Sequence, residues 1–300
     1  MIQAVRVGNS TLYFNNSPSH ITGEYYIYCC KLILQSMSSW EKPLNVVVGP
    51  YNVSIEGDVP LVRIDIQPEH TLVKQGGRSV DEVIVGSVKV IDNPDENYLV
   101  RVANFDYFNS LHNTLEYSLP NMVNLKLSGI RKFDDYIKKA IHIAPILYDS
   151  FNFDEREDGR VISMFTSSAS PRRDKFLECG EVENVQNVYS LNDLKNLYRE
   201  TGVMVNVHQT DHHHTFEELR VLPALCNGVL IVSEDVPLKG HIPYSDHIIW
   251  CPYDCLDSKV KEVKSNYREY HRKVFNEKLK NKLLTMVEKN KKNILKIGMN

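Results

Sequence analysis

Residues 201–235, TGVMVNVHQTDHHHTFEELRVLPALCNGVLIVSED, read without interruption as a strand, a polar loop, a helix, a glycine turn and a second strand. The β-branched run from Val203 to Val207 predicts the first strand. Thr215 and Glu218 have the spacing of a capping box, which predicts that the helix begins there and ends before Gly228. Such a unit places its loop at the carboxyl ends of parallel strands, where open α/β sheets bind their ligands. We therefore expect the functional site at this loop.

The same alternation of strands and helices continues on both sides of this unit. Val161 to Phe165 predicts a strand, and Ser170 followed by Pro171 predicts the N-cap and first residue of a helix. Val185 to Tyr189 predicts another strand, and the Lys-rich stretch from about Leu256 to Leu295 predicts a long helical segment. Repeated strands and helices at this spacing predict an α/β fold with a parallel sheet.

The amino-terminal half shows a looser form of this pattern. Apolar runs predict strands at Leu44 to Val48 and Leu61 to Ile66. The stretch from Asp149 to Gly159 is the most polar and turn-rich segment between the two halves. We therefore expect two α/β domains, residues 1–150 and residues 151–300, with the boundary in this stretch.

Composition and charge argue against several classes of function. The 300 residues carry a formal net charge of -3 with a pI near 6.4, which gives no support to a nucleic-acid-binding surface. No apolar run approaches the roughly 18 residues of a membrane span, and the amino terminus lacks the apolar core of a signal peptide. We expect a cytoplasmic protein with no integral membrane segment and no nucleic-acid partner. The sequence leaves the oligomeric state open.

Several segments of the second half carry a resemblance to a known family. They are VISMFTSSASPRRDKFLE, VYS, GVMVNVHQ, FEELRVLPALCNGVLIVSED and HIIWCPYD. Over roughly residues 140–270 the chain resembles the carboxyl-terminal domain of GT-B fold glycosyltransferases, in the group that includes family 4 enzymes and their bacterial and large-virus relatives. The resemblance implies two Rossmann-like domains facing each other across a cleft. Residues 1–150 would form the acceptor-side domain, and residues 151–300 would form the nucleotide-sugar-binding domain with a terminal helix.

The resemblance also implies an activity. The protein would be a hexosyl- or pentosyltransferase that moves a sugar from a nucleotide-diphosphate-sugar donor to a hydroxyl group of a glycan or glycoconjugate acceptor. The family implies no essential metal and no cofactor, since the nucleotide sugar is a co-substrate. The sequence agrees in lacking an Asp-x-Asp triplet of the kind that other glycosyltransferases use to hold a divalent cation.

Three cations resemble the diphosphate-binding Arg and Lys positions of the family: Arg172, Arg173 and Lys175. Without a metal, the charge that develops on the leaving diphosphate needs cationic side chains and backbone amides. Positive charge at a helix amino terminus opposes the helix dipole, so cations placed there are explained by a bound anion. Alternatively, the three side chains are exposed to solvent on the first turn of the helix and bind no ligand.

Further donor-binding candidates lie in and around the loop. They are Tyr189, His208, His214, Thr215, Phe216, Glu217 and Glu218. Many members of the family carry two glutamates eight positions apart, and here Thr215 and Pro223 occupy those positions. The resemblance therefore leaves the retaining or inverting outcome open. Glu217 is the candidate for the ribose, and Glu218 is expected to act either as the cap partner or as a ligand.

An inverting reaction would need a general base, because the acceptor hydroxyl loses its proton as it attacks. In the GT-B arrangement this group generally comes from the amino-terminal domain. The candidates are His20, in the first loop, and the pair Glu69 and His70, where a loop between a strand and a helix is expected. Each of the three has a structural loop role as its alternative.

Two other functions stay open from the sequence. The cluster from His208 to His214 also contains Asp211, His212 and His213, and imidazole with carboxylate suits zinc or iron, so a metal-dependent hydrolase is one alternative. The spacing matches neither His-x-His on a strand nor histidines four apart on a helix, so we predict no metal site. The other alternative is a non-catalytic module that binds a sugar nucleotide or a glycan.

Overall fold

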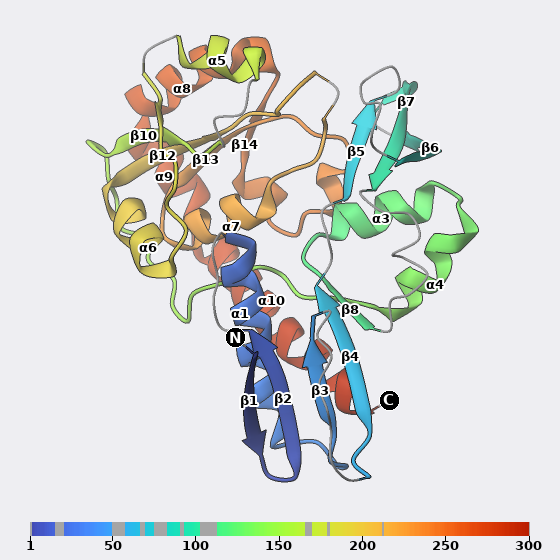
Figure 1. Cartoon of the computed structure of the whole chain (residues 1–300). Coiled ribbons are helices and arrows are strands. Elements are labelled where there is room, and N and C mark those ends of the chain that lie inside the picture. The colour runs from blue at the N-terminus through green and yellow to red at the C-terminus, as the bar shows by residue number, and fades with distance from the viewer. Residues whose placement is uncertain are drawn as a thin grey trace.

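The computed structural model describes residues 2–15, 21–49, 58–66, 70–74, 83–90, 93–102, 113–165, 170–178, 181–211 and 213–299. These residues form an α/β structure with three sheets (Figure 1). A six-stranded sheet belongs to the first half of the chain and a five-stranded sheet to the second half, and a three-stranded sheet lies beside them. The α/β class with parallel sheets is therefore confirmed.

The first sheet has the strand order β1-β2-β3-β4-β8-β9, in which β1 and β2 form an antiparallel hairpin and the other neighbours are parallel. Its elements are β1 (Ile2–Val7), β2 (Ser10–Asn15), α1 (Ile21–Met37), β3 (Asn45–Val48), β4 (Leu61–Ile66), β8 (Asn113–Glu116), α3 (Leu119–Leu127), α4 (Arg131–Lys139) and β9 (Ala140–His142). Every residue of β3 is buried, as expected for the centre of a parallel sheet covered on both faces.

The three-stranded sheet is antiparallel and consists of β5 (His70–Lys74), β6 (Val83–Val90) and β7 (Asn93–Val102). It packs beside α3 (Figure 1). The expectation of a loop leading from β4 into a helix at His70 is wrong, because the chain enters β5 there. The β-branched residues that follow His70 favour extended backbone over a helix.

The second sheet is parallel throughout, with the order β11-β10-β12-β13-β14. Its elements are β10 (Arg160–Ser163), α5 (Pro171–Leu177), β11 (Glu183–Asn184), α6 (Leu191–Glu200), β12 (Thr201–Asn206), α7 (Glu218–Cys226), β13 (Leu230–Glu234) and β14 (Ile249–Cys251), with the short helices η1 (Lys239–His241), η2 (Ser245–His247) and η3 (Tyr253–Cys255) around β14. The predicted cap at Ser170 is confirmed, since its hydroxyl accepts from the backbone of Arg173.

Two local predictions in this half are wrong. The strand expected at Val185 to Tyr189 is the two-residue β11 instead, and Asn187 has a left-handed backbone conformation with φ 62° that an extended strand excludes. The capping box is absent, because α7 begins at Glu218 itself and Glu217 is its N-cap without a side-chain cap bond. Glu218 turns into the interior, where the hydroxyl of Tyr244 donates to it.

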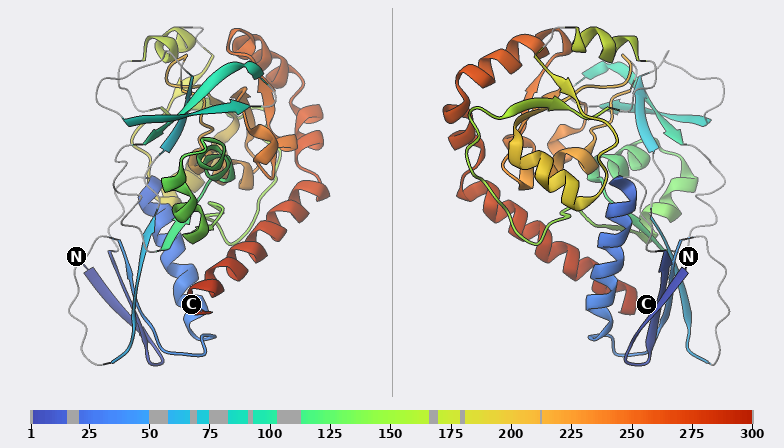
Figure 2. Two further views of the ribbon diagram at one scale, coloured as in Figure 1. Left: turned by 90° about the vertical axis from the view of Figure 1, so that its right-hand side faces the viewer. Right: turned by 60° about the vertical axis from the view of Figure 1, so that its left-hand side comes forward.

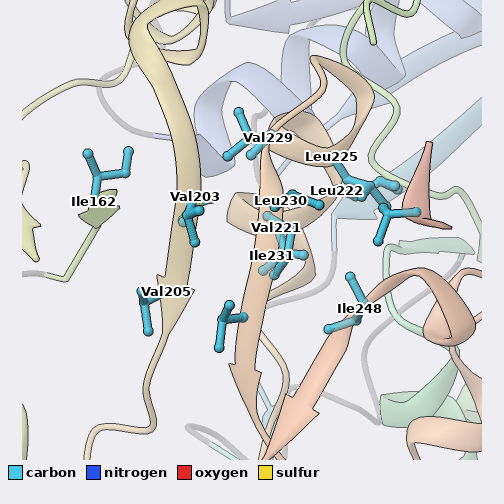
Figure 3. Packing of buried hydrophobic residues seen from close by; sticks show 14 of the residues in the cluster. Ile162, Val203, Val205, Val221, Leu222, Leu225, Val229, Leu230, Ile231 and Ile248 are labelled. Carbon is cyan, nitrogen blue, oxygen red and sulfur yellow. The ribbon is translucent and has the colours of Figure 1, made fainter. Parts of the chain in front are cut away.

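The core of the second half lies between β12, β13 and the helices that cover them. All residues of both strands are buried, and α7 and α8 (Leu256–Ser265) contact both of them. Figure 3 shows side chains of this core, among them Val203, Val205, Ile231 and Leu222, which belong to one cluster of buried apolar residues. This packing places the carboxyl ends of β12 and β13 next to each other.

The Lys-rich segment is helical, as predicted, but it is divided into α8, α9 (Tyr267–Val274) and α10 (Glu277–Leu295). The last of these helices crosses back to the first sheet and packs on α1 (Figure 2). Asn290 of α10 is buried and exchanges hydrogen bonds with the backbone of Ala144, and Asn293 donates to the carbonyl of His142. The carboxyl-terminal helix therefore joins the two halves.

We expect Gly228→Ala to destabilise the protein by more than about 1 kcal/mol, because φ at Gly228 is +78° and an added Cβ would lie 2.7 Å from the carbonyl oxygen of Asn152. Urea unfolding measures this loss. Gly240→Ala is the matched control, since nothing lies within 4 Å of its added Cβ. Equal stability of the two variants would contradict the packing of residue 152 on the turn after α7.

Candidate functional site

The candidate site lies at the carboxyl edge of the second sheet. Three polar segments converge there: the start of α5, the loop 207–217 that follows β12, and Glu234 at the end of β13. In a parallel sheet the strand ends lie at one edge, so residues far apart in the sequence meet. The expectation that the loop after β12 belongs to this edge is confirmed.

Arg172 is held by internal carboxylates. Its Nη1 donates to Glu234 Oε2 at 2.6 Å, and its Nε donates to Asp211 Oδ1 at 2.5 Å. The guanidinium also lies 3.6 Å from the ring centroid of Tyr253. Arg172 therefore does not need a bound anion to explain its position, contrary to the expectation from the helix dipole, because Glu234 and Asp211 already supply negative charge.

Arg173 has a different environment. It is 6% exposed, its Nε and Nη2 both donate to the carbonyl oxygen of Val207, and its guanidinium lies 4.7 Å from the ring centroid of Phe165. No carboxylate within the described ranges is close enough to form an ion pair with it. Burial lowers the pKa of Arg173 to about 10, while nearby Glu217 raises it. A buried cation with this environment attracts an anion.

His208 lies at the end of β12 and is 4% exposed. Neither of its ring nitrogens makes a hydrogen bond within the described part of the chain, although Nδ1 lies 3.4 Å from Glu234 Oε1. Burial lowers the pKa of His208 well below its ordinary value, and the nearby His214 and Arg172 add to this effect. The lowered pKa favours the neutral imidazole, which has one donor and one acceptor not used by the described residues.

The remaining loop residues surround these groups. The ring centroid of His214 lies 5.4 Å from that of His208, and its Nε2 lies 3.1 Å from the carbonyl oxygen of Asp211. Phe216 is buried against Trp250. Thr215 is half-buried and does not cap a helix.

Glu217 stands at the start of α7 with its side chain 34% exposed, 3.8 Å from Arg220. It is close enough to Arg173 to raise the pKa of that side chain, against the larger effect of burial. The structure thus brings Arg173, His208 and Glu217 to one edge. Lys175 is exposed on α5, and Tyr189 is 36% exposed before α6.

Glu218 lies between the two halves of the chain. It is 2% exposed, and Oε2 accepts from Tyr244 at 3.0 Å, while Oε1 has no hydrogen bond from the described residues. Burial raises the pKa of Glu218 to about 7; Ser118 and Tyr244 lower it, and Glu116 raises it. Because Glu116 is the last residue of β8 in the first sheet and Ser118 follows that strand, this carboxyl group belongs to the contact between the halves.

The raised pKa predicts a pH dependence of stability. The folded protein keeps the proton on Glu218 up to about pH 7, whereas the unfolded chain releases it near the ordinary value of 4.5. The protonated carboxyl group of Glu218 therefore contributes fully to the stability of the folded protein below about pH 4.5. This contribution is lost as the pH rises through 7. The free energy of unfolding of Glu218→Gln should not fall over this pH range. Between pH 4.5 and 7 we expect it to rise by on the order of 2 kcal/mol relative to that of the wild type.

Urea unfolding of both proteins at pH 5, 6 and 7.5 measures the difference. His142, whose pKa burial lowers to about 4, is present in both proteins, so its contribution cancels. Glu217→Gln, at a more exposed position, is the matched control. Parallel pH profiles for Glu218→Gln and the wild type would show that Glu218 is not protonated in the folded state.

The candidates for the general base are not brought to this edge by any described contact. His20 and Glu69 lie outside the described residues. His70 is the first residue of β5, paired with Val102 of β7, and only its backbone position is described. Their proposed role stays a prediction.

Three side chains shape the site without having been predicted from the sequence: Asp211 as a partner of Arg172, Glu234, and Arg220. Glu234 was detectable in principle as a polar residue at the end of an otherwise apolar strand. Arg220 lies in the first turn of α7 and lowers the pKa of Arg173, an effect smaller than that of burial. The contacts of Asp211 and Glu234 with Arg172 join separate elements, so no local pattern predicts this pairing.

Within the described ranges no three His, Cys, Asp or Glu side chains gather in a geometry that could hold a metal ion. His212 of the histidine cluster lies outside those ranges. No helix among the described residues has the length and apolar character needed to cross a bilayer.

The chain is similar to a viral protein. The chain is 29% identical over 185 residues to an uncharacterized protein of Acanthamoeba polyphaga mimivirus. The match covers 56% of this chain and 65% of that protein, so it spans less than two thirds of the relative. No protein-family model matches the chain.

Proposed function

We propose that this protein is a metal-independent glycosyltransferase of the GT-B type, which moves a sugar from a nucleotide-diphosphate-sugar to a hydroxyl group of a glycan or glycoconjugate. The observation that carries the proposal is the pair of buried polar groups at the carboxyl edge of the second sheet. Arg173 is a buried cation without a carboxylate in ion-pair range in the described ranges, and His208 is a buried imidazole whose nitrogens make no hydrogen bond there. Both environments favour a ligand that carries negative charge and hydrogen-bonding oxygens.

A diphosphate satisfies these requirements. Two of the donors of Arg173 are directed at the carbonyl of Val207, which leaves other N–H groups of the guanidinium for phosphate oxygens. The cation would stabilise the negative charge that develops on the diphosphate as the bond between the sugar and the diphosphate breaks. Arg172 would position the site instead, because it holds Glu234 and Asp211 together.

Glu217 would bind the ribose. Its carboxylate is partly exposed at the amino end of α7 and can accept two hydrogen bonds from vicinal hydroxyl groups. Its proximity to Arg173 would place the ribose next to the diphosphate. His208 and His214 would line the same pocket.

The arrangement of the parallel strands of the first and second sheets supports a site shared between the halves. Asn121 of α3, which follows β8, lines the same narrow cavity as His214, which follows β12. Residues beyond the carboxyl ends of strands from both sheets therefore meet, as an acceptor-side domain and a donor-side domain would require. In this proposal residues 1–150 present the acceptor and residues 151–300 bind the donor.

Release of nucleoside diphosphate from UDP-glucose, GDP-mannose, ADP-glucose and dTDP-glucose tests the proposal. We expect chelator-treated protein to turn over at least one of these donors, slowly with water and faster with an acceptor. Loss of activity with chelator and recovery with zinc would favour the metal-dependent hydrolase. Binding of a donor without turnover would favour the non-catalytic module.

A further inference from the structure

Two asparagines of α3 are buried without the hydrogen bonds that their side chains require. Asn121 is 3% exposed and Asn124 is 1% exposed. Nδ2 of Asn121 and both Nδ2 and Oδ1 of Asn124 have no hydrogen-bond partner in the described part of the chain. Buried amide groups are almost always paired in folded proteins, because an unpaired one costs free energy. These atoms therefore mark a place where a polar partner is expected.

Both side chains line one narrow cavity. They are three positions apart on α3, so they share one face of the helix. The cavity is also lined by His214 and Thr215 from the loop after β12 and by Pro237 before η1. The cavity measures about 10 Å³, which is the space of one water-sized group.

The chemistry of this cavity favours a neutral hydroxyl group over an anion. The backbone N–H of Asn121 is already used by the hydroxyl of Ser118, the N-cap of α3, so this amide is not available to a phosphate. A side-chain amide both donates and accepts, as a hydroxyl group does. Two adjacent amides with unused donors and an unused acceptor match vicinal hydroxyl groups of a sugar.

We propose that Asn121 and Asn124 bind hydroxyl groups of a sugar that enters between α3 and the segment His214 to Phe216. The inference rests on the proposed function and extends it, because it assigns specificity to two residues of the first half. One hydroxyl group occupies the cavity, and the sugar ring stays at its mouth. The sugar is either the one carried by the donor or the terminal sugar of the acceptor, and the two sources share this chemistry.

The double variant Asn121→Leu/Asn124→Leu tests the proposal. Leucine matches asparagine in shape and removes the unpaired amides, so the free protein is expected to unfold at a temperature at least about 2 °C higher. Asn281→Leu, at an exposed position of α10, is the control for the gain in helix propensity. A melting temperature below that of the control variant and the wild type would show that the amides make stabilising bonds, and would overturn the proposal.

Binding distinguishes the two sources of the sugar. Calorimetry compares UDP, GDP, ADP and dTDP with UDP-glucose, GDP-mannose, ADP-glucose and dTDP-glucose, and an array of immobilised glycans reports acceptor binding. The double variant is expected to bind the nucleoside diphosphates within twofold of the wild type. One of two affinities is expected to fall at least tenfold relative to the wild type. It is either the affinity for the nucleotide sugar, compared with that for the matching nucleoside diphosphate, or the affinity for glycans.

The outcomes separate this proposal from the proposed function. In one outcome the wild type binds nucleotides, and the double variant keeps both the affinity that the donor sugar adds and the binding of glycans. This result overturns the role of the asparagines and leaves the proposed function standing. Glycan binding that depends on the asparagines, in a protein that binds no nucleotide, overturns the glycosyltransferase alone. A wild-type protein with no sugar-dependent signal overturns both. If the double variant does not fold, Asn121→Leu alone carries the same test.

Discussion

Arg173→Met is expected to weaken nucleoside diphosphate binding at least tenfold, or about 1.4 kcal/mol. The substitution removes a buried positive charge that no described carboxylate pairs with, and it keeps an apolar chain against Phe165. Calorimetric titration with the diphosphate that binds the wild type most tightly measures the loss. The change also removes two donors from the carbonyl of Val207, so circular dichroism must show that the fold is intact.

Two variants that each remove an exposed cation serve as controls for Arg173→Met. Lys175→Met removes an exposed cation from the same helix, and Arg199→Met removes an exposed cation from α6. Both are expected to change the dissociation constant less than Arg173→Met does. An unchanged affinity of folded Arg173→Met would refute the assignment of this residue to the diphosphate.

Glu234→Gln is expected to lower the free energy of unfolding by about 3 kcal/mol. The side chains of Arg172 and Glu234 are 12% and 10% exposed, so removing the carboxylate leaves a largely buried guanidinium without its main counter-charge. Asp211→Asn is the matched control. Its side chain is 80% exposed, and its ion pair with Arg172 is expected to contribute less than about 1 kcal/mol.

Denaturant unfolding of Glu234→Gln, Asp211→Asn and the wild type at one pH measures the loss in free energy of unfolding for each variant. A loss in Asp211→Asn as large as that in Glu234→Gln would mean that solvent exposure does not govern the strength of these pairs. No loss in Glu234→Gln would mean that Arg172 finds another partner. Either result would contradict the role given to Glu234 in holding the start of α5 against β13.

Much of the second half could be predicted because its signals are local. The apolar runs of β12 and β13 and the Ser170-Pro171 start of α5 each follow from a few neighbouring residues. Where a local rule failed, a distant contact decided the outcome. Glu218 matches a capping box by spacing, yet burial against Tyr244 determines its position.

The meeting of two polar segments at one edge of the second sheet could be predicted from the sequence, but the contacts made there could not. The loop 207–217 and the start of α5 do lie together, since parallel strands place their carboxyl ends at one edge. The charge balance was not predictable, because Glu234 pairs with Arg172 across 62 positions of the chain. Asn121 and Asn124 gave no signal at all, since their importance depends on burial and on missing partners.

A structure of the protein with a bound nucleoside diphosphate tests the central claim most directly. The account predicts the diphosphate next to the guanidinium of Arg173 at the start of α5, with the ribose against Glu217 at the start of α7. A nucleotide bound elsewhere would contradict the account, for example in the cavity of about 680 Å³ between Trp40 and Pro60. A zinc or iron ion held by His208 and His214 in place of the diphosphate would contradict it as well.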